Sequence, residues 1–426
     1  MLNLLSVHKK KVVFFTIILL LMIFVTFQAP NIKSFLYQEY PNLSLHKEFR
    51  GKKSLREHIE NDYNVTFLPD TQFEKLNLVK NKINFKSEYY TKLLKTKNGI
   101  ASPNYGSFFI EVIKNNIWIV DYLGTFYIID KKKINIKSSI NITPQIVASN
   151  FSSKNVLDVL IHDNKIFISS ASVKNKCKTL KIYAAEINLK TLVFEEFFSA
   201  GECGDTVLAG RMQFYNHFGE NGIIITTHGH LYNKPDNTPQ DDESIYGKII
   251  FVDFKNKKPL IFSKGHRLSQ GLFVNDDLIL QTEHGPRGGD EINKISFGKN
   301  YGWPITSYGE KYGLGYTNKS YYKKNHDKYG FEEPIYSFVQ SIGISEIIKL
   351  PNSFSEHFQN NFILSSLYGR HIYRIKFDKN FKKIIYLEDI FVGERIRDLK
   401  FDDKLNLIYL AFEENGEIGI ISNKFN

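Results

Sequence analysis

The sequence is poor in cysteine, methionine and tryptophan, with 2 Cys, 3 Met and 2 Trp among 426 residues. Two cysteines cannot build a cysteine-rich zinc site or a disulfide scaffold, although they suffice for one disulfide bond. Phenylalanine and tyrosine are abundant, with 35 Phe and 24 Tyr, and such rings favour strands. The composition therefore excludes a collagen-like or fully disordered chain and predicts a β-rich protein rather than a helical bundle.

The chain has no excess of acidic residues, because it contains 56 Lys and Arg and 45 Asp and Glu, which gives a net charge of +11. Lysine, asparagine and isoleucine recur along the whole sequence. We interpret the basic balance as a general compositional bias and expect no nucleic-acid partner.

The amino terminus carries an uncharged run from Val12 to Phe27, which His8-Lys9-Lys10-Lys11 precedes. This flank predicts that the lysines stay in the cytoplasm and that the remainder is exported. Residues 28–30 give no clear cleavage signal. We predict an inner-membrane anchor or uncleaved signal over residues 1–28, with a cleaved signal peptide as the alternative, and a tether over residues 29–63. On the periplasmic side Cys177 and Cys203 can form a disulfide, with free thiols as the alternative.

A repeat becomes visible where an Asn, Asp or Gly turn leads directly into a short apolar run. The six runs are IWIV from Ile117, IFIS from Ile166, IIIT from Ile223, LIL from Leu278, FIL from Phe362 and LIYL from Leu407. A strand-like segment precedes and follows each run. Three or four strands per unit, repeated six times, predict a six-bladed β-propeller over residues 64–426.

The last repeat ends after its third strand and lacks an outermost one. The segment from Tyr63 to Phe85 is apolar enough to supply that strand and close the ring, and a simple linker is the alternative. The long step between the fourth and fifth repeats predicts an insertion between Phe297 and Glu332, at the channel mouth where ligands bind.

The stretch from Thr282 to Asn293, TEHGPRGGDEIN, combines glycines and a proline with acidic side chains. Exposed carbonyls and carboxylates are hard oxygen ligands, which Ca²⁺ prefers. A tight turn without an ion is the alternative.

The segment from Gly265 to Pro304 resembles the signature of the soluble glucose/sorbosone dehydrogenases, the pyrroloquinoline quinone (PQQ) dependent aldose sugar dehydrogenases. The matching motifs are Gly265-His266-Arg267, Gln270-Gly271-Leu272, EHGPRGGDEIN and GKNYGWP. The similarity extends from about Ser102 to the end of the chain, and the family is itself a six-bladed propeller.

The resemblance implies a set of site residues. It places a Ca²⁺ ion on Gly285, Pro286, Asp290 and Tyr301, where the ion polarises the quinone of PQQ. It also places Arg267, Arg395 and Arg397 at the cofactor and substrate. Paired surface arginines are the alternative for the last two.

The chain departs from the family at several positions. Val207 stands where the family has its catalytic histidine, and Leu268 stands where an asparagine contacts PQQ. His228 and His230, in the segment THGH, are candidate replacement bases, with ordinary loop histidines as the alternative.

Two functions follow from these features. The first is a membrane-anchored oxidoreductase that oxidises a sugar or related polyol at a PQQ–Ca²⁺ centre and passes electrons to a periplasmic acceptor. The second is a catalytically inactive, calcium-stabilised propeller that binds a carbohydrate, an envelope component or a protein partner.

Overall fold

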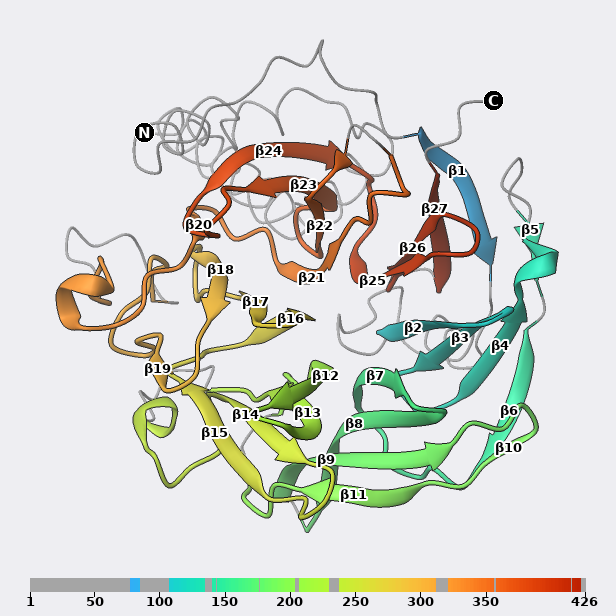
Figure 1. Cartoon of the computed structure of the whole chain (residues 1–426), viewed down its shortest axis with the longest axis horizontal. Coiled ribbons are helices and arrows are strands. Elements are labelled where there is room, and N and C mark those ends of the chain that lie inside the picture. Colours follow the sequence, from blue (N-terminus) through green and yellow to red (C-terminus); the bar gives the residue numbers. More distant parts are fainter. Residues whose placement is uncertain are drawn as a thin grey trace, which may run out of the picture. The chain divides into compact units, whose positions relative to one another are not determined.

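The computed structural model describes residues 77–84, 107–134, 140–142, 144–175, 177–203, 207–229, 237–311, 321–355, 358–414 and 416–422. These residues form six β-sheets arranged as blades around a common axis (Figure 1). The predicted all-β six-bladed propeller is confirmed. The predicted anchor and tether, residues 1–28 and 29–63, lie outside the described residues. In the part that is described, no helix is long and apolar enough to cross a membrane.

The blades follow one another along the chain. Blade 1 consists of β2 (Phe108–Ile113), β3 (Asn116–Asp121), β4 (Phe126–Asp130), β6 (Gln145–Ser149) and β10 (Thr191–Leu192), and blade 2 of β7 (Val156–His162), β8 (Lys165–Lys174), β9 (Cys177–Glu186) and β11 (Glu195–Ser199). Blade 3 consists of β12 (Met212–His217), β13 (Glu220–Thr226), β14 (Lys248–Asp253), β15 (Pro259–Lys264) and β19 (Lys299–Asn300), and blade 4 of β16 (Ser269–Asn275), β17 (Leu278–Glu283), β18 (Asp290–Ile295) and β20 (Tyr336–Phe338). Blade 5 consists of β21 (Ile344–Lys349), β22 (Asn361–Ser366), β23 (His371–Phe377) and β24 (Ile384–Phe391). Blade 6 consists of β25 (Ile396–Asp402), β26 (Leu407–Phe412), β27 (Glu417–Ser422), β1 (Asn77–Asn84) and β5 (Ile140–Asn141).

The ring closes through a strand from the amino-terminal part of the chain. Strand β1 pairs antiparallel with β27, from Asn77 opposite Ser422 to Asn84 opposite Glu417. The prediction that the segment before the first repeat supplies the missing outer strand is therefore confirmed. This pairing covers an edge of β27 that would otherwise expose unpaired backbone groups.

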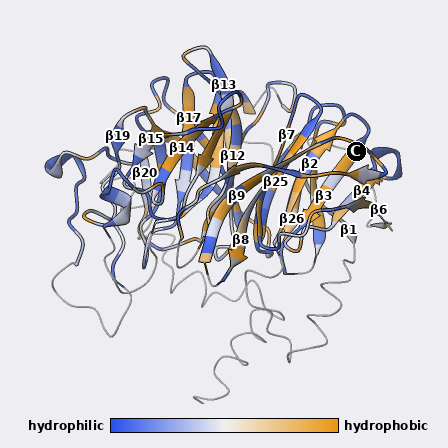
Figure 2. Cartoon of the chain, turned by 90° about the horizontal axis from the view of Figure 1, so that it is seen from below, coloured by the Kyte–Doolittle hydropathy of each residue, from blue (hydrophilic) through white to orange (hydrophobic). Residues whose placement is uncertain are grey.

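The blades are apolar on both faces because each lies between two neighbours. Strands β22 and β26 are buried along their whole length. Separate apolar clusters fill the spaces between consecutive blades, as between blades 1 and 2 around Trp118 and Ile168 and between blades 2 and 3 around Leu180 and Ile225. Figure 2 shows hydrophobic residues along the strands and hydrophilic residues in the turns.

The propeller has two distinct ends. Turns from the first to the second strand and from the third to the fourth strand of each blade lie at one end, which we call the hairpin face. Connections from the second to the third strand, and from one blade to the next, lie at the other end, which we call the loop face. Within the described ranges, short 3₁₀ helices lie in connecting segments: η2 (Lys131–Lys133), η3 (Thr238–Gln240) and η4 (Asp327–Tyr329).

The predicted insertion after Phe297 reaches the loop face. Arg287 and Glu310 exchange a pair of backbone hydrogen bonds of 3.0 and 2.9 Å, which join the insertion to the connection between β17 and β18. The connection between β11 and β12 is held by a disulfide between Cys177 and Cys203. The predicted disulfide is confirmed.

Candidate active site at the loop face

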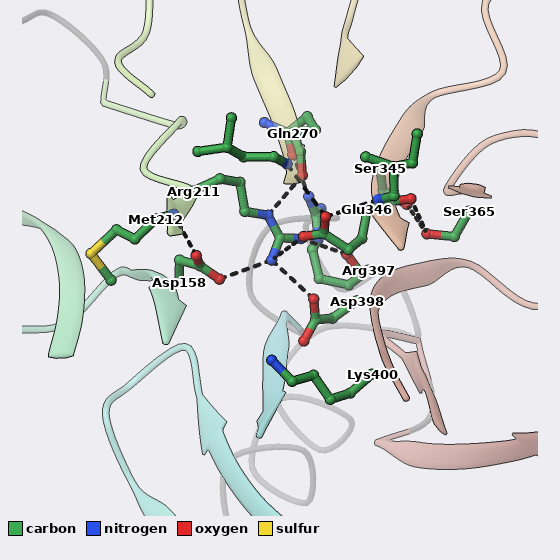
Figure 3. Close-up of polar contacts among 12 residues, drawn as sticks. Asp158, Arg211, Met212, Gln270, Ser345, Glu346, Ser365, Arg397, Asp398 and Lys400 are labelled. Carbon is green, nitrogen blue, oxygen red and sulfur yellow. Dashed lines mark hydrogen bonds and ion pairs between the residues drawn. The ribbon is translucent and has the colours of Figure 1, made fainter. Parts of the chain in front are cut away.

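A buried arginine, Arg211, joins all six blades at the axis of the propeller (Figure 3). It directly precedes β12 of blade 3. Its Nη1 lies 2.9 Å from Asp158 Oδ1 of blade 2, 3.1 Å from Glu346 Oε2 of blade 5 and 3.0 Å from Asp398 Oδ1 of blade 6. Its Nε donates to the Gln270 carbonyl of blade 4, and its guanidinium lies 4.9 Å from the Phe109 ring of blade 1.

The carboxylates around Arg211 also connect neighbouring blades directly. Asp158 accepts the N–H of Met212 at 2.7 Å, Asp398 accepts that of Ile110 at 2.8 Å, and Glu346 accepts that of Leu272 at 3.3 Å. Together with Glu111, which binds Lys400 at 2.6 Å, these groups form what we call the central charge cluster: Glu111, Asp158, Arg211, Glu346, Asp398 and Lys400.

Four carboxyls in this cluster face two cations, and burial disfavours their charged forms. Burial raises the pKa of Glu346 to about 8, that of Glu111 to about 7 and that of Asp158 to about 6, although the nearby cations act against the shift. Burial lowers the pKa of Arg211, but Glu346, Asp158 and Asp398 outweigh it and the net shift is upward. All these groups have partners within the chain, so the cluster is a structural connector.

The predicted arginines 395 and 397 lie together at the loop face, next to this cluster. Arg397 donates through Nε to Glu413 Oε2 at 2.8 Å, and Arg395 donates through Nε to Glu413 Oε1 at 2.7 Å. Arg397 Nη1 also donates to Gln270 Oε1 at 2.7 Å. The buried Glu413 carboxylate thus balances only one of the two guanidinium charges, and the partly exposed Glu414 lies 3.9 Å from Arg395 Nε.

The third predicted arginine, Arg267, belongs to the connection between β15 and β16. Its Nη1 donates to the carbonyls of His284 and Gly285 at 2.8 and 2.7 Å, and its guanidinium lies 5.3 Å from the Trp303 ring. Among the described residues, its buried Nε has no hydrogen-bond partner. A buried charged donor without a partner is costly, so this atom suits an anionic ligand.

His284 lies between these arginines. Its Nε2 lies 2.6 Å from the carbonyl of Ile344, and its backbone N–H donates to the carbonyl of Leu268. Burial lowers the pKa of His284; Asp290 acts against this shift, and Arg267 and Arg397 add to it. The imidazole is therefore neutral at neutral pH, and the net positive charge of the site comes from the arginines.

Two of the four predicted calcium ligands, Asp290 and the Gly285 carbonyl, already have hydrogen-bond partners within the chain. Asp290 Oδ1 accepts hydrogen bonds from Gly285 N–H and Ser341 Oγ, and Oδ2 accepts from the N–H groups of Ile342 and Ile344. A carboxylate offers about four lone-pair directions, so Asp290 has none left for an ion.

The remaining predicted ligands do not supply a free set either. The Gly285 carbonyl accepts from Arg267, a cation that competes with Ca²⁺ for the same oxygen. Tyr301 packs its ring against His266 at 4.7 Å, and its hydroxyl donates to the Lys294 carbonyl. Among the described residues no group of three or more His, Cys, Asp or Glu is arranged to hold a metal. The carbonyls of Pro286 and Tyr301 stay predicted ligands, and we derive no catalytic step through the ion.

The candidate bases lie in the connection after β13. His228 is buried, and the N–H of its neighbour Gly229 donates to the Arg267 carbonyl at 2.7 Å, which places this segment beside the arginine. His230 lies outside the described residues. Val207 packs in the apolar cluster between blades 2 and 3, while Leu268 packs against Ala209, with Leu208 beside them. Apolar side chains of two separate clusters, Val207 and Leu268, therefore occupy the positions where the resemblance expects a histidine and an asparagine.

Sequence reasoning missed Glu413 and the central charge cluster, and it gave Gln270 no role although it noted the motif that contains this residue. A signal for the cluster was present, because an acidic residue interrupts the apolar first strand of four blades: FFIEVI, VLDVLI, ISEIIK and IRDLKF. No sequence signal identified Glu413 as the partner of both arginines.

The structure is thus a six-bladed propeller with three arginines, Arg267, Arg395 and Arg397, at its loop face. Residues 109–420 match the family model described as Glucose / Sorbosone dehydrogenase. The chain belongs to the glucose/sorbosone dehydrogenase family, as the resemblance predicted.

Relatives with known names agree with this assignment. The chain is 28% identical to the aldose sugar dehydrogenase YliI of Escherichia coli over 225 residues, which cover 48% of the chain and 59% of the relative. It is 30% identical to quinoprotein glucose dehydrogenase B of Acinetobacter calcoaceticus over 139 residues, or 28% and 29% of the two chains. The matches thus span less than two thirds of either relative.

Solved structures share the fold. A crystal structure of glucose dehydrogenase matches with a TM-score of 0.63 at 20% identity, covering 75% of this chain and 96% of that one. The PQQ-bound aldose sugar dehydrogenase of Streptomyces coelicolor matches with a TM-score of 0.51 at 16% identity, covering 74% and 98%.

Proposed function

We propose that the protein is a PQQ-dependent oxidoreductase that oxidises a hydroxyl group of an aldose or related polyol. The observation that carries this proposal is the arginine group of the loop face, Arg267, Arg395 and Arg397, in which Glu413 accepts hydrogen bonds from Arg395 and Arg397, while among the described residues Arg267 donates only to carbonyls. PQQ is a polycarboxylate, and guanidinium groups bind carboxylates with charge-assisted hydrogen bonds. The family match favours this function over a binding propeller without activity.

The roles of the residues follow from their positions. Arg267 offers its free Nε to a carboxylate of the cofactor, while Arg395 and Arg397 bind a second anionic group and stay anchored to Glu413. His228, beside Arg267, is the proposed acceptor of the proton that leaves the sugar hydroxyl. When bound, PQQ would act as the two-electron acceptor for the hydride from the carbon that bears this hydroxyl group. The electrons then pass to an acceptor on the exported side of the membrane.

The apolar patch of Leu208, Ala209 and Leu268 shapes the substrate side of the site. These side chains exclude water and offer no hydrogen bond to a sugar hydroxyl. A site lined with amide groups rejects a wrong sugar because that sugar leaves buried polar groups without hydrogen bonds. An apolar lining lacks such groups, so we expect the protein to discriminate less strongly among aldoses.

The test is a titration of the full chain with PQQ, followed by dye reduction with a panel of aldoses. Arg267→Gln is expected to weaken PQQ binding at least tenfold, whereas Arg370→Gln leaves it unchanged, since the partly exposed Arg370 pairs with Glu414 on the same face. His228→Asn is expected to retain PQQ binding and to lower the rate of reduction by roughly 10²–10⁴. His217→Asn, at the hairpin face, is the matched control.

Binding of PQQ without any sugar-dependent reduction would overturn the enzymatic role and leave a binding propeller. Absence of PQQ binding would overturn the proposal as a whole.

A further inference from the structure

The hairpin face carries a repeated turn that the proposed activity does not use. In three blades the turn between the third and fourth strands starts with an aspartate and continues with lysines: Asp130–Lys133, Asp253–Lys258 and Asp378–Lys383. The aspartate accepts backbone N–H groups of its own turn, from Lys132 in blade 1, from Asn256 and Lys258 in blade 3, and from Asn380, Lys382 and Lys383 in blade 5.

The carboxylates of Asp130, Asp253 and Asp378 thus point toward the backbone of their own turns, and most of the lysines of these turns are exposed to solvent. The exposed lysines of these outer turns, with one from blade 2, form what we call the lysine rim: Lys132, Lys133, Lys190, Lys255, Lys257, Lys258, Lys379, Lys382 and Lys383. Several exposed acidic residues on the same face, such as Asp163, Asp276 and Asp403, belong to the turns between first and second strands, nearer the axis, while Glu186 and Glu195 flank the outer turn of blade 2. The periphery of the hairpin face is therefore basic.

An exposed aromatic group accompanies the rim in blades 3 and 4. Phe218 is 87% exposed at the turn between β12 and β13, and Phe297 is 47% exposed beside it, with ring centroids 6.2 Å apart. Phe218 also has a positive φ of 48°, which is unfavourable for a bulky residue. The equivalent turns of blades 1, 2 and 4 place Lys114, Asp163 and Asp276 in this conformation. At Phe218 the backbone conformation is unfavourable for a bulky residue, and the exposed ring contacts water. An apolar environment outside the chain would bury this ring.

The chain also enters the propeller at this face. Asn77, the first residue of β1, pairs with Ser422 at the end of β27, and Ser422 pairs with Leu407 at the hairpin turn of blade 6. The preceding sequence includes the uncharged run from Val12 to Phe27. About 50 residues separate this run from β1. If the run is inserted in a membrane, a connection of this length keeps the propeller at a high effective concentration near the membrane surface.

We propose that the hairpin face lies on an anionic lipid bilayer, with the lysine rim on the headgroups and Phe218 in the interfacial layer. Lysines attract anionic lipid surfaces, and aromatic rings are favoured at the boundary between headgroups and acyl chains. The arrangement turns the loop face, with its arginines, away from the membrane and toward soluble substrates. It needs no cofactor and stands independently of the proposed activity.

The experiment uses the full chain in nanodiscs of phosphatidylcholine alone or with one third phosphatidylglycerol. The only two cysteines are joined in a disulfide, so a single introduced cysteine takes a fluorophore selectively. Leu189→Cys places the label beside the lysine rim, and Val339→Cys places it at the loop face, where the native residues are similarly exposed. A lipid carrying a quencher near its headgroup reports proximity to the bilayer.

We expect at least threefold stronger quenching at position 189 than at position 339 with phosphatidylglycerol, and a loss of this difference in phosphatidylcholine or in 0.5 M salt. In the Leu189→Cys background, Lys257→Glu, Lys258→Glu, Lys382→Glu and Lys383→Glu together are expected to abolish the quenching. Lys154→Glu with Lys311→Glu, two exposed lysines of the loop face, is the matched control and is expected to have no effect.

Phe218→Asn is expected to weaken the quenching while preserving the turn, because asparagine tolerates a positive φ. Far-UV circular dichroism of each variant checks that the propeller is intact. Equal quenching at both positions, quenching that ignores phosphatidylglycerol, or the same fluorescence change with a soluble polyanion would overturn the proposal.

Discussion

Removal of the Arg211 side chain is the perturbation to which the propeller should be most sensitive. Arg211→Met deletes ion pairs to Asp158, Glu346 and Asp398 and two hydrogen bonds to carbonyls of blades 4 and 6, while it leaves three carboxylates buried. Breaking a buried ion-pair network by removing one partner costs about 3–5 kcal/mol. At about 2 °C per kcal/mol for a domain of this size, the Tm should fall by about 6–10 °C.

The assay is thermal and urea unfolding of the wild-type and variant chains. Arg374→Met is the matched control, because Arg374 is equally buried but its carboxylate partner, Glu388, is partly exposed and is solvated once the arginine is gone. Arg211→Met with Glu346→Gln should recover part of the loss, since it removes one of the three buried acidic groups that lose their partner. The destabilisation should also shrink at pH 5, because burial raises the pKa of Asp158 to about 6 and this carboxyl takes up a proton below that pH. A cost no greater than that of Arg374→Met would refute the reasoning.

Three further predictions concern the same fold. Burial raises the pKa of Glu346 to about 8 from an ordinary value of 4.5, so its stabilising effect is present at low pH and is lost as the pH rises through 8. Between pH 5 and pH 9 the Tm of the wild type should therefore fall relative to the Tm of Glu346→Gln, and a constant difference between the two would contradict this. Cys203→Ser opens a 26-residue step and should cost about 3 kcal/mol, with reduced wild type melting at the same temperature as the variant. Asp290→Asn should lower the free energy of unfolding by about 1–3 kcal/mol, because the buried side chain loses hydrogen bonds. A chelator should leave the wild-type Tm unchanged, and a fall in Tm on chelation would show that an ion holds the connection between β17 and β18.

The blades could be predicted from the sequence because each repeat carries its own local signal. A polar turn followed by an apolar run, as at Asn221-Gly222 before Ile223, depends only on neighbouring residues. The closing strand was also predictable, because a missing outer strand in the last repeat requires a partner from elsewhere. The disulfide was one of the two outcomes considered for a single pair of cysteines, and it was expected on the prediction that the chain is exported.

The site was less predictable because it depends on which side chains meet across blades. The pairing of Glu413 with Arg395 and Arg397 joins two loops that the sequence presents as separate charged segments. Asp290 illustrates the same limit, since its sequence position in a glycine-rich loop does not reveal the hydrogen bonds that it accepts from the N–H groups of Ile342 and Ile344, more than 50 residues away. Long-range hydrogen bonds of this kind leave no periodic pattern in the sequence.

The central claim, that the arginines of the loop face bind PQQ for sugar oxidation, is tested most directly by titrating the full chain with PQQ. We predict saturable binding that Arg267→Gln weakens at least tenfold and that Arg370→Gln leaves intact, followed by reduction of the bound quinone when an aldose is added. Binding that is equally strong in the Arg267→Gln variant, or no binding in the wild type, would contradict the account.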